Sequence, residues 1–162
     1  MFDHHYALRT TWTGDRGVGT TDYDAYGRDH VIVAPGKHEI EGSADRPFRG
    51  QVDRWNPEEM LLGALSQCHL LSYLWLCSTN GVVVTAYVDD AVGTMVQTRD
   101  GGGHFTEATL RPTVTVRDPS MVERARELHG LASEKCYIAS SVNFPVKHEP
   151  TIVVAASTQQ PA

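Results

Sequence analysis

One stretch, residues 56–77, constrains the fold more than any other because it predicts a long helix that is apolar on nearly every side. Asn56 suits the position that caps a helix, and Pro57 suits the first helical position, where its missing N–H has no partner. Two glutamates follow in the first turn, where negative charge meets the positive end of the helix dipole. The pair Asn80-Gly81 is typical of a left-handed cap that ends a helix. We therefore expect a core helix that is surrounded by protein.

The remaining chain predicts short strands and one further helix. Before the central helix, alternating residues indicate strands at 6–13, 20–26 and 30–34, followed by an irregular segment at 37–55. After it, a hairpin is expected from 82–98 and 104–117 with a bulge at Gly93, then a helix from Asp118-Pro119 to Cys136, a strand at 151–156 and a frayed tail from 157. Because the strands come in runs, the pattern predicts a single α+β domain over residues 1–162, with mainly antiparallel sheet.

Composition excludes several classes of function. The formal net charge of -6 disfavours a nucleic-acid binder that relies on a basic face. The first residues are polar, so we expect no signal peptide, and the polar residues within the central helix argue against a membrane span. Three cysteines in 162 residues form no disulfide framework. We therefore expect a cytoplasmic protein with reduced thiols and no membrane partner.

A polar island, Ser66-Gln67-Cys68-His69, interrupts the apolar helix and makes Cys68 a candidate nucleophile. A lone helical cysteine is more often a buried structural residue, so further support is needed. Cys68 lies about three turns beyond the helix start, too far for the dipole to activate a thiolate, and so it needs a nearby cation. In the loop before the helix, Arg49 and Arg54 are the best-placed candidates to supply this cation.

Cys136 is expected at the end of the second helix, where the dipole disfavours a thiolate, and this suits a resolving cysteine that reacts second. The pair then predicts a peroxide cycle through a sulfenic acid and a Cys68–Cys136 disulfide. Cys77 lies on the side of the central helix opposite to Cys68, and we assign it a structural role. His69 is rotated by about 100° from Cys68 and is not an obvious base for it.

Two other chemistries fit less well. A zinc site is disfavoured because no Cys-x-x-Cys occurs and the eight histidines lack ligand spacing, so we expect no metal and no bound cofactor. We interpret His129 and His148 as structural residues. A Cys-His hydrolase stays open as an alternative that uses a histidine other than His69.

The run Asn56-Pro57-Glu58-Glu59-Met60-Leu61, followed by Ser66-Gln67-Cys68-His69 and a distant Cys136, resembles the OsmC/Ohr superfamily. These are the osmotically inducible protein C and organic hydroperoxide resistance proteins. The resemblance covers most of the chain. It implies sheets wrapped around a buried central helix in an intertwined homodimer, with the active site at the subunit interface.

The same resemblance assigns roles to particular residues. It implies that Cys68 is the peroxidatic cysteine, that Cys136 is the resolving cysteine, and that Glu58 orients an arginine. Arg49 matches this arginine best, and Arg54 is the reserve. The sequence departs from the well-studied branches in carrying a tyrosine rather than proline after Cys136, which is similar to a third branch of OsmC-like proteins.

Helix geometry independently favours a shared site. On one helix, Glu58 and Cys68 are about 15 Å apart along the axis, so the carboxylate cannot touch the thiolate of its own chain. A second, antiparallel copy would bring them together and cover the apolar helix. We therefore expect an obligate homodimer in which Arg49 bridges a carboxylate and a thiolate.

The expected function is a cysteine-based peroxidase that reduces organic hydroperoxides, with hydrogen peroxide as a second candidate substrate. An external dithiol or lipoyl-type reductant is expected to complete the cycle. The alternative is a redox-sensing or small-ligand-binding OsmC-like dimer with little turnover.

Overall fold

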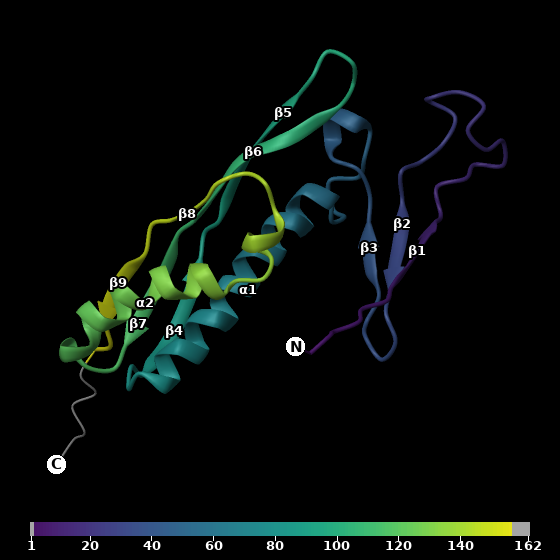
Figure 1. Ribbon diagram of the computed structural model, residues 1–162. Coiled ribbons are helices and arrows are strands. Elements are labelled where there is room, and N and C mark those ends of the chain that lie inside the picture. The colour runs from purple at the N-terminus through teal and green to yellow at the C-terminus, as the bar shows by residue number, and fades with distance from the viewer. Residues whose placement is uncertain (1, 157–162) are drawn as a thin grey trace. The chain divides into compact units, whose positions relative to one another are not determined.

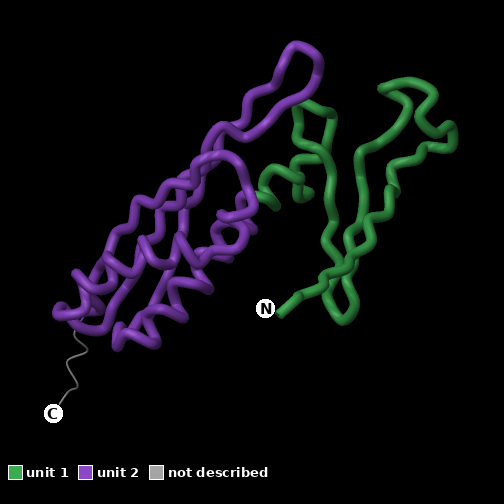
Figure 2. The backbone as a smooth tube through the Cα atoms, viewed as in Figure 1, with its two compact units in different colours: residues 1–61 green, residues 62–162 purple. Residues whose placement is uncertain are grey.

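The computed structural model describes residues 2–156, and the chain divides into two compact units, one ending at Leu61 and the other beginning at Leu62 (Figures 1 and 2). Each unit is described by itself below. The expected frayed tail from residue 157 lies outside the described residues. Both α-helices and several short sheets are present, which confirms the expected α+β class.

The N-terminal unit contains an antiparallel sheet in the order β1-β2-β3. Its strands are β1 (Arg9–Trp12), β2 (His30–Val33) and β3 (Ile40–Gly42), and a 3₁₀ turn follows at Arg46–Phe48. Strand β3 lies in the segment that the sequence analysis treated as irregular. That segment carries little alternation, and its strand of three residues is formed by pairing with β2.

The strand expected at 20–26 is wrong, because this segment is a loop of consecutive turns. The Asp15 carboxylate accepts hydrogen bonds of 2.9 Å from the backbone N–H groups of Gly17 and Gly19. Further along, the Arg28 guanidinium donates to two loop carbonyls, at 2.6 and 2.8 Å. These local bonds satisfy the backbone without a neighbouring strand and compete with sheet formation.

Helix α1 (Pro57–Thr79) begins and ends as predicted. The backbone N–H of Glu59 donates to the Asn56 side chain at 2.8 Å, which satisfies one free donor of the first turn. At the other end, Gly81 has a φ of 72°, and the backbone N–H of Val82 donates to the Cys77 carbonyl at 3.0 Å. This is the left-handed cap that glycine permits.

Only one face of α1 is buried in the single chain, so the expectation of a helix surrounded by protein is not met within it. The buried residues recur every three or four positions: Leu65, His69, Tyr73, Leu76 and Cys77. On the other face, Leu71 is 65% exposed and Trp75 is 55% exposed. By length and composition alone α1 could cross a membrane, a property that core helices share.

In the C-terminal unit, the first sheet has the order β4-β7-β9 and packs against both helices (Figure 1). Its strands are β4 (Val84–Asp89), β7 (Pro112–Val116) and β9 (Thr151–Val154), and the second helix is α2 (Val122–Lys135). Strands β7 and β9 are parallel neighbours. The core between these elements is apolar, with Tyr73, Val114, Val116 and Leu128 fully buried.

The second sheet of this unit has the order β5-β6-β8, with β5 (Val92–Gln97), β6 (Gly103–Leu110) and β8 (Val146–His148). The two long strands of the expected hairpin are therefore each divided, and β8 was not predicted. The bulge expected at Gly93 is wrong, because the register shift lies between Thr94 and Met95. A Cβ on Gly93 would lie 2.8 Å from the Phe105 ring, so glycine here allows close packing.

Candidate functional site

The structure brings together the two cysteines that the sequence analysis selected. Cys68 is partly exposed on α1, whereas Cys136 ends α2 and is 1% exposed. Both are free thiols, and they lie close enough together for Cys68 to influence the ionisation of Cys136. Burial, reinforced by the neighbouring Cys68 thiol, raises the pKa of the Cys136 thiol to about 11. At neutral pH this thiol is therefore protonated, and Cys68 is the more accessible of the two.

The segment after Cys136 turns back on itself and holds the thiol in place. The backbone N–H of Ala139 donates to Cys136 Sγ at 3.4 Å, and Ser140 Oγ donates to the Cys136 carbonyl at 3.1 Å. Apolar residues of the same segment, including Ile138 and Phe144, pack against a small core around Leu65 of α1. The segment that carries Cys136 is therefore anchored to α1 by apolar packing one turn before Cys68.

The other candidates, Arg49 and Glu58, belong to the N-terminal unit. Arg49 follows the 3₁₀ turn with a φ of 65°, forms an ion pair with Asp24, and lies 4.8 Å over the Tyr23 ring. Among the described residues, Glu58 Oε2 is buried with no hydrogen-bond partner. Within this unit, then, Arg49 is paired with Asp24 and not with the expected Glu58.

Arg54, the reserve arginine, is also paired. Its guanidinium lies 3.4 Å from Glu41, and its side chain is 25% exposed. Arg54, like Arg49, is therefore paired with a carboxylate other than the expected Glu58.

An aromatic cluster near Glu58 was missed by sequence reasoning. The Arg28 guanidinium lies 4.3 Å from the Tyr23 ring centre and 4.2 Å from that of Tyr26, a geometry that favours cation–π attraction. Tyr26 and Arg28 line a hollow of about 450 Å³ together with Trp12 and Glu58. Closely spaced tyrosines flanking an arginine are the only signal that could have indicated it.

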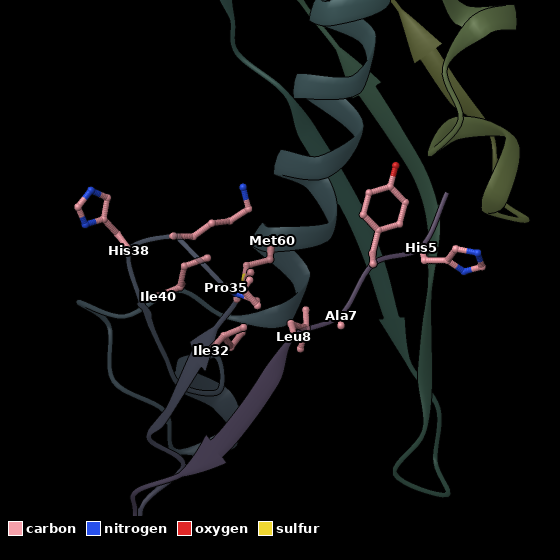
Figure 3. A pocket seen from close by; sticks show the side chains of 11 residues that line it. His5, Ala7, Leu8, Ile32, Pro35, His38, Ile40 and Met60 are labelled. Carbon is pink, nitrogen blue, oxygen red and sulfur yellow. The ribbon is translucent and has the colours of Figure 1, made fainter. Parts of the chain in front are cut away.

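A second hollow in the N-terminal unit is mostly apolar (Figure 3). It has a volume of about 520 Å³, and its walls include Leu8, Ile32, Ile40 and Met60. Basic or titratable side chains also line it, namely His5, Lys37 and His38. The combination suits a ligand with an apolar body and a polar or anionic end.

Next to the thiol pair, three histidine rings pack together in the core of the C-terminal unit. The planes of His69 and His129 are 14° apart and that of His148 is tilted by 36° from His69, and we call this group the histidine stack. His69 Nε2 lies 3.0 Å from His129 Nδ1, and the His148 ring centre lies 4.3 Å from that of His69. Burial lowers the pKa of His69 to about 3 and that of His129 to about 4, and it also lowers the pKa of His148. Stacked rings do not converge on one point, and in residues 2–156 no group of three His, Cys, Asp or Glu side chains is arranged to hold a metal ion.

Comparison with known proteins agrees with this fold. The OsmC-like protein family model matches residues 50–151. An OsmC-like protein of unknown function from Vibrio cholerae is similar at 30% identity and a TM-score of 0.80, covering 91% of this chain and 99% of that one. An organic hydroperoxide resistance protein from Elizabethkingia anophelis shares the fold at 17% identity and a TM-score of 0.66, covering 95% and 100%.

A further relative is the uncharacterized protein YmaD of Bacillus subtilis, which is 25% identical over 151 residues, 91% of this chain and 92% of the relative. The matched family segment, residues 50–151, spans more than half of the 162 residues and includes both cysteines of the thiol pair. The chain therefore belongs to the OsmC-like protein family.

Proposed function

We propose that this chain is a cysteine-based peroxidase that reduces organic hydroperoxides, with hydrogen peroxide as a second substrate. The observation that carries the proposal is the neighbouring pair of free thiols, with Cys68 on α1 and Cys136 at the C-terminal cap of α2. Neighbouring thiols need no large movement to form a disulfide. Membership of a family that includes organic hydroperoxide resistance proteins supports the same chemistry.

In the first step, the Cys68 thiolate attacks one oxygen of the peroxide. The S–O bond forms as the O–O bond breaks, the alcohol leaves with a proton, and the sulfur is oxidised by two electrons to a sulfenic acid. In the second step, Cys136 loses its proton and attacks the Cys68 sulfur, which releases water and forms the disulfide. An external dithiol, of lipoyl type for example, returns two electrons and regenerates both thiols.

The chemical surroundings favour an organic peroxide over a small polar one. The segment that follows Cys136 packs its apolar residues on the half of α1 that carries Cys68. An alkyl or aryl group would be removed from water on such a surface, whereas hydrogen peroxide would gain nothing from it. The cytoplasm, where thiols stay reduced, is the compartment that suits this cycle.

We assign activation of Cys68 to Arg49, oriented by Glu58, across a homodimer interface. The Glu58 oxygen that is buried without a partner is a ready acceptor for a guanidinium. The apolar face of α1 that the single chain leaves exposed, which includes Leu71 and Trp75, is a surface that a second copy would cover. In this proposal Arg49 exchanges Asp24 for Glu58 when the site assembles.

A second candidate function is that of a redox-sensing or ligand-binding dimer with little turnover. The apolar hollow of about 520 Å³ in the N-terminal unit favours it, because such a hollow can hold a ligand independently of the thiols. The two functions differ in whether the oxidised protein is regenerated.

A steady-state peroxidase assay with cumene hydroperoxide and dihydrolipoamide separates them. We expect continuous consumption of peroxide that is lost in Cys68→Ser. If Cys68 is oxidised once and no dithiol restores turnover, the peroxidase proposal is overturned and the sensing function is supported.

A further inference from the structure

The three stacked histidines occupy particular places in the chain relative to the thiols. His69 directly follows Cys68 on α1, while His129 lies on α2 before Cys136 and His148 lies on β8 after it. The segment that carries Cys136 therefore leaves the stack at His129 and returns to it at His148. Both of its ends contact the residue next to Cys68.

The contacts are those of a buried, specific attachment. His69 is 0% exposed and His129 is 2% exposed, and the bond of 3.0 Å between them joins α1 to α2. The ring centres of His69 and His129 are 5.3 Å apart, with an angle of 14° between the ring planes. The ring centre of Tyr73 lies 3.9 Å from that of His129. Within residues 2–156, His69 Nδ1, His129 Nε2 and His148 Nε2 have no hydrogen-bond partner, and a purely structural core would be served by leucines of similar volume without that cost.

We propose that His69, His129 and His148 are positioning residues for the thiol pair, holding both ends of the Cys136 segment against the Cys68 turn of α1. The inference rests on the proposed function for its biological use, since a disulfide that must form rapidly benefits from thiols kept in contact. None of the three histidines touches peroxide in this scheme.

The charges around the stack make the attachment sensitive to acid. Three groups act on the stack directly: Tyr73 of α1 and Arg126 of α2 at His129, and Asp89 of β4 at His148. Cys77 and Tyr87 lie behind Tyr73 and contact that ring. Among these groups, Asp89 favours a charged imidazole at His148, whereas Arg126 opposes charge on His129. A proton is therefore bound more readily when the stack is open, so acid shifts the equilibrium towards release of the Cys136 segment.

The first test measures thiol pairing without peroxide. The effective concentration of the Cys68–Cys136 pair is obtained from its equilibrium with reduced and oxidised glutathione. We expect His129→Gln and His148→Gln to lower it about tenfold, because the thiols separate. His104→Gln, on an exposed part of β6, is the matched control and should match the unsubstituted protein within twofold.

The second test needs no substitution and so remains decisive where a variant fails to fold. Amide hydrogen exchange is followed for Ser140 and Ser141, whose N–H groups donate to Cys136 and Ile138. After correction for the intrinsic rate, protection should fall at least tenfold from pH 7 to pH 5, and this fall should be absent in His148→Gln.

The inference is overturned if amide protection is unchanged between pH 7 and pH 5. It is also overturned if the histidine variants fold and their effective thiol concentration equals that of His104→Gln. Because neither test contains peroxide, its failure is distinct from failure of the proposed function. A protein that passes both tests yet consumes no hydroperoxide would keep the positioning role and lose the peroxidase assignment.

Discussion

The Cys136 thiol lies beside the Cys68 thiol in the reduced protein, and burial together with this neighbour raises its pKa to about 11. This relationship orders the two steps of the proposed cycle. Cys68 is partly exposed and can meet a peroxide, while Cys136 is 1% exposed and protonated at neutral pH. The second thiol is thus protected from peroxide yet close enough to trap the oxidised first one.

The raised pKa of Cys136 predicts that disulfide formation speeds up with pH. The thiolate is the attacking species, and its fraction grows tenfold per pH unit while the pH stays below the pKa. We expect the rate of the second step to rise by about this factor per unit between pH 7 and pH 9. Single-turnover reactions, quenched with acid and analysed by mass spectrometry, measure it. A rate independent of pH would show that Cys136 is not the attacking thiol.

Serine substitutions should separate the roles of the three cysteines. Cys68→Ser should abolish peroxide consumption, whereas Cys136→Ser should permit one oxidation and then accumulate sulfinic acid on Cys68. Cys77→Ser is the matched control, because that thiol is buried in the same core cluster as Tyr73, away from the thiol pair. It should keep activity and lose about 1–2 kcal/mol of stability. Peptide mapping that finds a Cys68–Cys77 disulfide would contradict the assignment.

The elements that sequence predicted well are those set by local chemistry. The Asn56 cap and the Gly81 cap delimit α1 because each satisfies backbone groups within its own turn. Strand β8 could not be predicted, since its three residues form a strand by parallel pairing with β6, far away in the sequence. The alternation at 20–26 was misleading because side-chain bonds from Asp15 and Arg28 favour a loop.

The residues of the candidate site also differ in whether the sequence alone could predict them. Cys68 and Cys136 could be selected because a polar island in an apolar helix and a helix end are visible in the sequence. The stack of His69, His129 and His148 could not, because 60 positions separate its first two members and no ligand spacing relates them. Nor could the pairing of Arg49 with Asp24, which depends on the path of the long loop after β1.

Arg49 and Arg54 offer a matched pair for testing activation of the thiol. Arg49 has a φ of 65°, which glycine adopts without strain, so Arg49→Gly removes the guanidinium and relieves the backbone. We expect the first oxidation to slow about 100-fold, the loss typical of removing one charge-stabilising donor. Arg54→Gly should leave that rate within a few-fold. Stopped-flow measurement of the first step decides between them, and the reverse result would make Arg54 the site arginine.

Acid should destabilise the C-terminal unit through its buried histidines. The pKa values of about 3 for His69 and about 4 for His129 lie below the value of 6.5 for the unfolded chain. The unfolded state therefore binds more protons below pH 6.5, and stability falls as the pH drops from there towards 4 and 3. We expect a loss of about 5 kcal/mol between pH 6.5 and pH 4, about half of it from each of these two histidines. Urea unfolding at several pH values measures it, and His129→Gln should flatten the dependence relative to His104→Gln. An equal slope in both variants would assign the acid sensitivity to other groups.

The last prediction is that the active site is shared between two chains. Glu58 and Cys68 lie on one continuous helix, about 15 Å apart along its axis, so the Glu58 carboxylate does not reach the thiolate of its own chain. A second copy of α1 packed across a two-fold axis would supply Glu58 in trans and cover the exposed face that contains Leu71 and Trp75. Mixing Glu58→Ala protein with Cys68→Ser protein tests this arrangement, because each heterodimer then regains one complete site. About a quarter of the unsubstituted activity is expected, since about half of randomly mixed dimers are heterodimers with one of two sites intact. Subunit exchange is verified with differently tagged chains, and exchange without recovery of activity would place both residues in the site of one chain.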